Sequence, residues 1–204
     1  FDAMKQDGVR KVKLPEPIVA FKEQIRDPEN NPFPTLSGKV EIDCGHIAEM
    51  ENPRIPSIPQ YLGHDEHYDA PLAAKYPLQL LTAHAKARTH SALEMVPWLQ
   101  EIESHGVWIS PVDAASRDIA QGDMVDVFND RGRIRIPAKV TERIMPGVVN
   151  VFQGAWYSPD KDGVDTGGCA NVLTGSDHSP GGALSMNSAL VQVERSRSDQ
   201  QEEK

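Results

Sequence analysis

Residues 121–140 read QGDMVDVFNDRGRIRIPAKV, and this stretch decides the fold. Residues 124–128 are a short, largely apolar run that predicts a strand, and residues 133–140 alternate between polar and apolar side chains as a half-buried strand does. Residues 129–132 begin with Asn and end with Gly, which suits a tight turn between two antiparallel strands. The stretch therefore predicts a β-hairpin, entered through a turn at residues 121–123.

Short strands are also predicted on both sides of this hairpin. They lie at residues 39–42, 78–82, 107–109, 148–152 and 190–194. One helix is predicted at residues 112–118, because Ser110 suits the N-cap, Pro111 the first helical position and Asp113 the third position after the cap. Several short strands with few helices favour a small β-barrel.

The chain is predicted to have three parts. Residues 1–76 form an extended arm or linker, since half of the 16 prolines precede residue 60 and proline interrupts both helices and sheets. Residues 77–195 form the barrel, and the polar residues 196–204 form a disordered tail. Within the barrel, the long loop 154–188 holds seven of the 15 glycines, and a loop of this length is either functional or disordered.

Composition excludes several classes of function. The net charge of -9 argues against nucleic acid as a partner, because phosphate binding needs a basic face. Two cysteines, Cys44 and Cys169, are too few for an iron–sulfur cluster or a structural zinc site, and a disulfide between them stays open. No charged-then-apolar leader is present, and no apolar run approaches the roughly 18 residues of a membrane span. Because the chain begins at Phe1, we expect a piece of a longer protein.

The first candidate site is the segment TAHAKARTHS at residues 82–91, directly after a predicted buried strand. Residues 70–93 contain no acidic side chain, although the chain has 30 of them, so Arg88 is expected to lack a carboxylate partner nearby in sequence. Arg and Lys give charge-assisted hydrogen bonds to phosphate, so the segment suits an anion. The alternative is a solvated basic loop, which composition alone favours. His84 and His90 have no carboxylate or thiolate near them in sequence and make a poor metal site.

Two further segments hold groups that suit a ligand. Residues 153–160, QGAWYSPD, offer an amide and two aromatic faces; the alternative is a turn whose rings cap the core. Residues 167–174, GGCANVLT, and the glycine-rich stretch 175–182 would let the backbone approach a ligand, and Asn171 could bond a heterocycle; the alternative is a flexible loop. Because G-x-G-x-x-G, Walker and G-x-S-x-G patterns are absent, common nucleotide sites and nucleophilic catalysis are unsupported.

Six segments, taken in order, resemble one family. They are PTLSGKVEI (34–42), LTAHAKARTHS (81–91), VWISPVDAA (107–115), QGDMVDVFNDRG (121–132), GAWYSPD (154–160) and ANVLT (170–174). Together they resemble the dinucleotide-binding end of the molybdopterin oxidoreductases. The sequences of residues 156–160 and 167–174 are most similar to those of the anaerobic dimethyl sulfoxide reductase A subunits and their paralogues. The resemblance covers about residues 30–195, and six motifs in the correct order make it specific.

The resemblance implies a fold and a cofactor. The fold is mainly β: a double-psi β-barrel with a few short helices and an extended N-terminal arm. The cofactor is a molybdenum ion held by two molybdopterin guanine dinucleotides, contacted here through its organic part. No catalytic residue and no metal ligand is implied in this chain. The residues implied to line the cofactor are Thr82, His84, Lys86, Arg88, Thr89, His90, Ser91, Gln153, Asn171 and Asn187.

For the whole protein, the resemblance implies two-electron reduction of an S-oxide or N-oxide in anaerobic respiration, with the isolated chain inactive. An iron–sulfur cluster would belong to an N-terminal region that this chain lacks. The implied partners are the remaining domains of the same catalytic subunit, an iron–sulfur electron-transfer subunit and a membrane anchor subunit, which give a periplasmic or membrane-associated location. The alternative function is a stand-alone β-barrel module for nucleotide binding or assembly, without redox chemistry.

Overall fold

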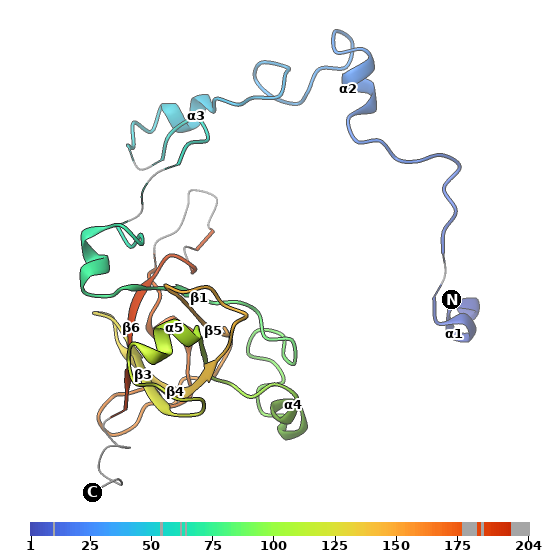
Figure 1. Ribbon diagram of the computed structural model, residues 1–204. Helices are drawn as coiled ribbons and strands as arrows, with labels where there is room; N and C mark the ends of the chain where they lie inside the picture. Colours follow the sequence, from blue (N-terminus) through green and yellow to red (C-terminus); the bar gives the residue numbers. More distant parts are fainter. Residues whose placement is uncertain are drawn as a thin grey trace, which may run out of the picture. The chain divides into compact units, whose positions relative to one another are not determined.

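The structure, a computed structural model, divides into two compact units, Phe1–Gln60 and Tyr61–Lys204 (Figure 1). The predicted domain boundary at residue 76 stays a prediction. The structure describes residues 1–9, 11–53, 55–61, 63, 65–176, 183–184 and 186–196.

The first unit has little buried surface in its described part. Its helices are α1 Asp2–Asp7, α2 Lys22–Arg26 and α3 Gly45–Ala48, and none of the three has a buried residue. Large apolar side chains such as Ile18 and Leu36 are 81% and 83% exposed. The unit therefore has the character of an arm, with short helices along an otherwise irregular chain.

The predicted strand at residues 39–42 is wrong. The segment follows a turn that is closed by its own backbone, in which Phe33 N–H donates to Gly38 O at 2.9 Å. Val40 and Ile42 are exposed. A strand requires a ladder of hydrogen bonds to a neighbour, and apolar alternation alone does not supply one.

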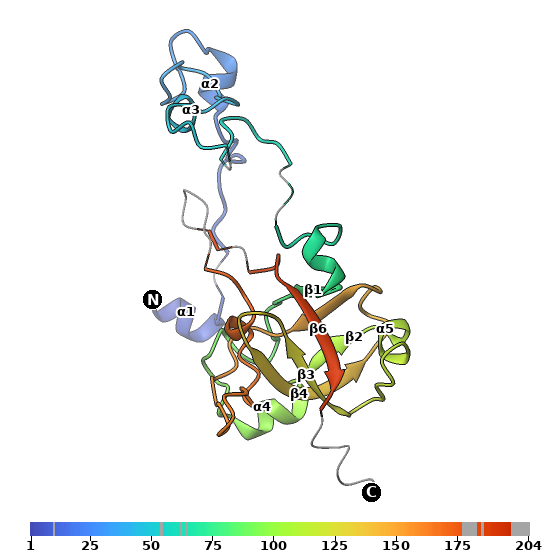
Figure 2. The ribbon, with the colours of Figure 1, turned by 90° about the vertical axis from the view of Figure 1, so that its left-hand side faces the viewer.

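The second unit contains a closed barrel of six strands, whose hydrogen-bonded order is β1-β5-β2-β4-β3-β6 (Figures 1 and 2). β1 pairs with β5 and β2 with β4 in parallel, and the other pairs are antiparallel. The predicted fold class, a mainly β double-psi barrel with a few short helices and an extended arm, is confirmed. The strands are β1 Leu78–Leu81, β2 Val107–Ile109, β3 Met124–Phe128, β4 Arg133–Val140, β5 Val148–Val151 and β6 Leu190–Arg195.

The strand predictions for the barrel agree with the structure to within one residue. β2, β3 and β4 have the predicted bounds, and the other three differ only at their last residue. Asn129 N–H donates to Gly132 O at 3.1 Å and closes the predicted hairpin turn. The predicted tail begins with Ser196, which is buried and donates its N–H to Met124 O at 2.9 Å; residues 197–204 lie outside the described residues.

The barrel interior holds the hydrophobic core. On β4, Ile134 and Ile136 are buried, whereas Arg133 and Arg135 are only half-buried, which is the predicted alternation. Each fully buried aliphatic side chain stabilises the fold by roughly 1.5–3 kcal/mol. The other strands contribute side chains at most 1% exposed: Leu78, Leu80, Val107, Ile109, Val125, Val127, Val149, Val151, Val191 and Val193.

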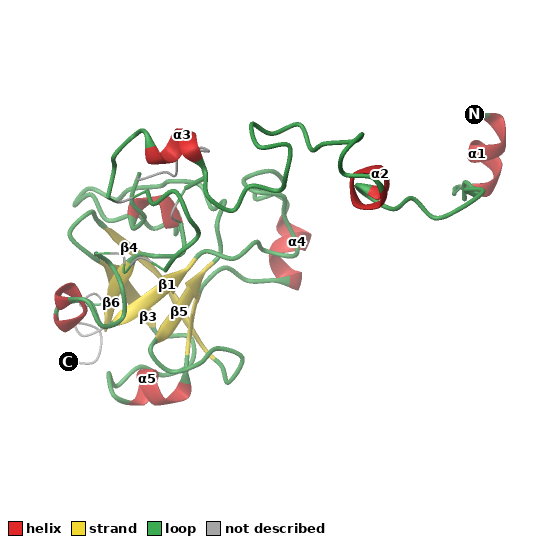
Figure 3. Cartoon of the chain, turned by 90° about the horizontal axis from the view of Figure 1, so that it is seen from above, coloured by secondary structure: helices red, strands yellow, loops and turns green. Residues whose placement is uncertain are grey.

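Strand direction gives the barrel two different ends. β1, β3 and β5 run one way, and β2, β4 and β6 run the other. The connections that follow β1 and β5, and those that precede β2 and β6, therefore meet at one end, which we call the loop end. The opposite end carries α5, Pro111–Ala115, which Figure 3 shows beyond the strands. The remaining short helices are η1 Pro71–Ala74, α4 Pro97–Ile102 and η2 Ala170–Val172.

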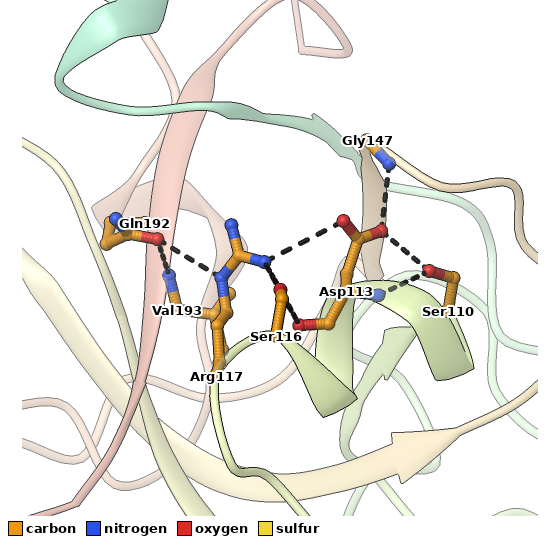
Figure 4. A network of polar contacts seen from close by, with 7 residues as sticks. All are labelled: Ser110, Asp113, Ser116, Arg117, Gly147, Gln192 and Val193. Carbon is orange, nitrogen blue, oxygen red and sulfur yellow. Dashed lines mark hydrogen bonds and ion pairs between the residues drawn. The ribbon is translucent and has the colours of Figure 1, made fainter.

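A polar network attaches α5 to the barrel (Figure 4). As predicted, Ser110 caps the helix: its Oγ accepts from Asp113 N–H at 3.0 Å and donates to the Asp113 carboxylate at 2.6 Å. The same carboxylate accepts from Gly147 N–H at 2.8 Å, on the turn before β5. Arg117 lies 3.7 Å from the other carboxylate oxygen and donates to the Gln192 side chain on β6 at 3.4 Å. The helix is thus joined to two strands.

Helix ends and starts were predicted less well than strands. α5 ends at Ala115, three residues before the predicted end at residue 118, because Asp118 takes a left-handed φ of 52° and the chain turns there. α4 was not predicted, since Pro97 opens it without any side-chain cap. No helix in the described part of the chain combines the length and apolar character that a membrane span requires.

We predict that residues 1–60 exchange their amide hydrogens faster than β3 does. Helices without buried side chains open at little cost, whereas Val125 and Val127 on β3 are fully buried. Hydrogen exchange read by mass spectrometry compares the two regions directly. Equal protection in both would contradict this prediction.

Replacing Asp113 by Ala should lower the free energy of unfolding by about 1–3 kcal/mol, because a helix cap and the partner of Gly147 N–H are both lost. Urea unfolding followed by tryptophan fluorescence measures the change. Val112→Ala is the matched control, since Val112 is 64% exposed on the same helix and should change stability by less than about 0.5 kcal/mol. Indistinguishable midpoints for the two variants would show that the network does not stabilise the barrel.

Candidate functional site

The loop end brings together the segments that follow β1 and β5. These strands are parallel neighbours, so their carboxyl ends lie side by side. The contact continues past the strands: His84 forms a β-bridge with Gln153, and Gln153 N–H donates to Ala83 O at 3.1 Å. The two segments predicted to carry a ligand site are therefore adjacent in space.

Asn187, in the segment before β6, contacts the start of the loop at residues 82–91. Its side-chain oxygen accepts from Thr82 N–H at 2.7 Å and lies 3.2 Å from Thr82 Oγ1, which also bonds Met186 O. Thr82 is buried, so it and Asn187 shape the start of the loop more than they face solvent. Sequence reasoning missed Asn150, whose buried side chain accepts from Ala83 N–H at 3.0 Å; the signal was a lone amide inside the apolar strand β5.

The loop at residues 82–91 folds back over the segment after β5. The rings of His84 and His90 lie 4.8 Å apart, and a Cβ on Gly154 would come within 2.0 Å of His90 O. Gly154 has a φ of 91°, so both its conformation and this close approach require glycine. Trp156 Nε1 donates to Ser91 O at 3.1 Å and fixes the far end of the loop. The exposed polar side chains of this loop are His84, Lys86, Thr89, His90 and Ser91.

Arg88 differs from the exposed polar residues of the loop because its side chain is mostly buried. Its side chain is only 7% exposed and forms an ion pair with Glu94, and its Nη2 donates to Phe152 O at 3.2 Å. The expectation that Arg88 lacks a nearby carboxylate is wrong: the partner stands one residue beyond the acid-free window. Glu103 also reaches the loop, where its carboxylate accepts from Lys86 N–H at 2.7 Å. The sequence of the loop thus contains no acidic residue, but Glu94 and Glu103 contact the loop in the folded chain.

His105, directly before β2, completes this support. Its Nδ1 lies 3.4 Å from Arg88 Nη2, and its Nε2 lies 3.1 Å from Gly168 O. Burial, and then the positive charge of Arg88, lower the pKa of His105 below its ordinary value. His105, Arg88, Glu94, Glu103 and Phe152 line part of a cavity of about 340 Å³ beneath the loop. No sequence motif had singled out His105.

The long loop after β5 is ordered over its described part by Asp165. This carboxylate is fully buried and accepts three backbone N–H groups: from Ser158 at 2.7 Å, Gly167 at 3.0 Å and Cys169 at 2.6 Å. Of the two predicted alternatives, a functional or a disordered loop, order is found as far as residue 176; residues 177–182 lie outside the described residues. Asp165 was also missed, although an acid in a glycine-rich loop was a visible signal.

Asn171 lies on the part of the long loop that packs against the β3–β4 turn. It is exposed on η2, and the residues next to it contact the β3–β4 turn: Leu173 O accepts from Asn129 Nδ2 at 2.8 Å, and a Cβ on Gly132 would meet Val172 at 2.6 Å. Gln153 lies beside the loop at residues 82–91 instead. The predicted site residues thus lie on several segments at one end of the barrel.

These residues fit the polar groups of a dinucleotide. Lys86 and the exposed imidazoles and hydroxyls of the loop are able to donate hydrogen bonds to diphosphate oxygens, and amides such as Gln153 and Asn171 can both donate and accept, as a base edge requires. Within the described residues, the buried Nε of Arg88 has no partner, which leaves a donor beneath the loop. No group of three or more His, Cys, Asp or Glu side chains in that part of the chain is placed to hold a metal ion.

The chain matches the molydopterin dinucleotide binding domain family over residues 78–186, more than half of its length. It therefore belongs to this family, and the match includes every predicted site residue except Asn187. In fold it is similar to acetylene hydratase from Pelobacter acetylenicus, with a TM-score of 0.66 and 19% identity over 83% of this chain and 25% of that one. The predicted resemblance to the molybdopterin oxidoreductases is confirmed.

Among its relatives are the dimethyl sulfoxide reductases DmsA of Haemophilus influenzae and Escherichia coli, 44% and 43% identical over 96% of this chain and 25% of each relative. The dimethyl sulfoxide/trimethylamine N-oxide reductase of Cereibacter sphaeroides is 37% identical over 77% of this chain and 20% of its own length. The chain thus spans at most a quarter of these relatives. The comparisons support a molybdopterin guanine dinucleotide as the cofactor. They favour a cofactor-binding part of an oxidoreductase over a stand-alone module for nucleotide binding or assembly.

Arg88→Ala should lower the free energy of unfolding by roughly 3–5 kcal/mol, because it leaves the carboxylate of Glu94, whose side chain is only 16% exposed, without its cation. Urea unfolding of the chain measures this change. Lys86→Ala is the matched control: it removes a cation from the same loop, but an exposed one, so the change should stay within about 0.5 kcal/mol. An Arg88→Ala variant as stable as Lys86→Ala would mean that the ion pair does not hold the loop.

Proposed function

We propose that this chain is the C-terminal cofactor-binding part of the catalytic subunit of a molybdenum bis(molybdopterin guanine dinucleotide) oxidoreductase that reduces S-oxides or N-oxides. The observation that carries the proposal is the loop at residues 82–91, which presents exposed donors at one end of a barrel of the dinucleotide-binding family. The relatives, which are dimethyl sulfoxide or trimethylamine N-oxide reductases, support the reaction class, and their greater length supports a larger catalytic subunit.

In this proposal the site residues have two kinds of role. His84, Lys86, Thr89, His90 and Ser91 face the ligand and bind its phosphate oxygens, because their side chains are exposed on the loop. Thr82, Asn187 and Arg88 hold the loop in shape. Gln153 and Asn171 bind base or pterin edges from two neighbouring segments. When bound, the cofactor supplies the oxygen-atom transfer at its metal, and this chain supplies position and electrostatics.

The division of the chain follows from the same proposal. Residues 77–195 are the dinucleotide-binding barrel, residues 1–76 are an arm that links it to a preceding domain, and residues 196–204 are a tail. Binding ends at the organic part of the cofactor, so this chain contributes no catalytic residue and no metal ligand. The isolated chain is then inactive.

Resemblance alone supports the wider assembly that we propose. An iron–sulfur cluster lies in the N-terminal region of the whole subunit, and electrons arrive through an iron–sulfur subunit. A membrane anchor subunit holds the complex, which gives a periplasmic or membrane-associated location. Nucleic acid is not among the partners, in keeping with the net charge of -9.

The full-length protein should release guanine nucleotide on denaturation, in a fixed ratio to molybdenum. Lys86→Ala should weaken retention by about 10- to 150-fold, because a charge-assisted contact of roughly 1.5–3 kcal/mol is lost while the fold is unchanged. Mass spectrometry of the released nucleotide, metal analysis and the melting temperature together measure this.

Lys13→Ala, which removes an exposed cation from the arm, is the matched control and should retain the cofactor fully. Purified full-length protein without guanine nucleotide would overturn the proposal in favour of a stand-alone module. Normal retention by Lys86→Ala would remove the loop at residues 82–91 from the site.

A further inference from the structure

We propose that His105 is a positioning residue for the dinucleotide, whose neutral imidazole ties together the loops that hold it. The inference rests on the proposed function, because it assigns His105 to the support of that same site. His105 itself does not touch the ligand in this proposal. It acts through Arg88 on one side and Gly168 on the other.

The two contacts of the ring fix its tautomer. A guanidinium only donates hydrogen bonds, so Nδ1, at 3.4 Å from Arg88 Nη2, must accept. A carbonyl oxygen only accepts, so Nε2, at 3.1 Å from Gly168 O, must carry the proton. Both contacts are satisfied at once only by the neutral ring with its hydrogen on Nε2. A protonated ring would turn a donor toward Arg88, which has no acceptor to offer.

Gly168 is packed against the ring closely enough to depend on it. Its φ is 78°, and a Cβ there would come within 2.4 Å of His105 Nε2 and 2.8 Å of Ile136 Cγ2. The backbone at Gly168, in the glycine-rich loop, therefore packs directly against the imidazole of His105 and the side chain of Ile136. If the ring moves or changes its hydrogen bonds, this loop must move with it.

Through Arg88 the ring reaches the other two site segments. Arg88 pairs with Glu94 and donates to Phe152 O at 3.2 Å, the residue immediately before Gln153. One imidazole therefore connects the loop after β1, the segment after β5 and the loop that leads to Asn171. These are the three segments to which the proposed site residues belong, apart from Asn187.

The charged groups around His105 are of both signs. Burial is the largest influence and lowers the pKa of His105, the positive charge of Arg88 lowers it further, and Glu94 and Asp165 oppose this. Glu103 lines the same cavity from the end of α4. Since the folded pKa lies below the ordinary value of 6.5, the contribution of the neutral ring is fully present above that pH. It is lost as the pH falls from there through the folded pKa.

The consequence is a site whose hold on the dinucleotide weakens in mild acid. The pH dependence of the wild-type protein sums the contributions of all its titrating groups, so by itself it does not isolate His105. A non-titrating substitution at residue 105 does.

The test uses the full-length, cofactor-loaded protein and measures the rate of guanine-nucleotide release at about pH 7.5 and about pH 5.5. His105→Gln places an amide donor near the position of Nε2, so it can keep the bond to Gly168 O without titrating. We expect it to release nucleotide near the wild-type rate at the higher pH and to lack the acceleration at the lower pH. His105→Ala should release roughly tenfold faster at both.

His46→Gln is the matched control, since His46 is an exposed histidine of the first unit, and it should keep the wild-type pH dependence. Melting temperatures are recorded for every variant. If His105→Gln and the wild-type protein accelerate equally in acid, the inference is wrong. It is equally wrong if His105→Ala melts lower but releases nucleotide at the wild-type rate, because the residue would then be structural only.

Failure of the proposed function would look different. The wild-type protein would then contain no guanine nucleotide at any pH, and the tie between the loops is tested in that nucleotide-free protein by hydrogen exchange. Residues 82–91 and 167–176 should lose protection together below about pH 6.5 in the wild type but not in His105→Gln. Independent or pH-insensitive exchange of the two segments would overturn the role of His105.

Discussion

The parallel pairing of β1 with β5 is the constraint on which the rest of the site depends. Parallel neighbours cannot be joined by a tight turn, so long connections must leave and re-enter the barrel. Because the barrel is closed, the connections after β1 and β5 are brought to one end, and their backbone groups need partners there. Side chains supply those partners: Asn187 at the end of β1, Asn150 beside it, and Asp165 within the long loop. In the described residues of this end, side chains thus supply the hydrogen-bond partners that neighbouring strands supply within the barrel.

The electrostatics of the loop end depend on the positions of two acidic residues, Glu94 and Glu103. Glu94 and Glu103 both come from the connection between β1 and β2 and approach the basic loop from beneath. Glu94 offsets the charge of Arg88, and Glu103 accepts the backbone N–H of Lys86. Among the described residues no ion pair joins either carboxylate to Lys86 Nζ, so this exposed loop carries a cation although the chain as a whole carries -9. A net charge that argues against nucleic acid is compatible with a local site for one diphosphate.

Local patterns in the sequence were sufficient for the barrel strands, because alternation reports which side chains face a closed core. The same pattern failed at residues 39–42, where Val40 and Ile42 have no sheet to join. The sequence predicted which segments contribute to the site, but it did not predict the contacts between them. Neither the buried pair of Arg88 with Glu94 nor the place of His105 is visible in sequence, since both depend on which loops the closed barrel brings together. Whether Asn171 lies near Lys86 is likewise decided by the packing of η2 against the β3–β4 turn.

The site contains both an exposed cation, Lys86, and a mostly buried one, Arg88, because the two perform different tasks. An exposed lysine can bind phosphate without disturbing the fold, since it is solvated in the free protein and exchanges water for ligand. A buried guanidinium would be costly alone, and it is stable here because Glu94, Phe152 O and a neutral His105 surround it. Its planar fork contacts Glu94, His105 and Phe152 O at once, which the single ammonium of lysine cannot do. The loop thus separates two tasks that look alike in sequence: Lys86 for binding, and Arg88 for holding the binding surface in place.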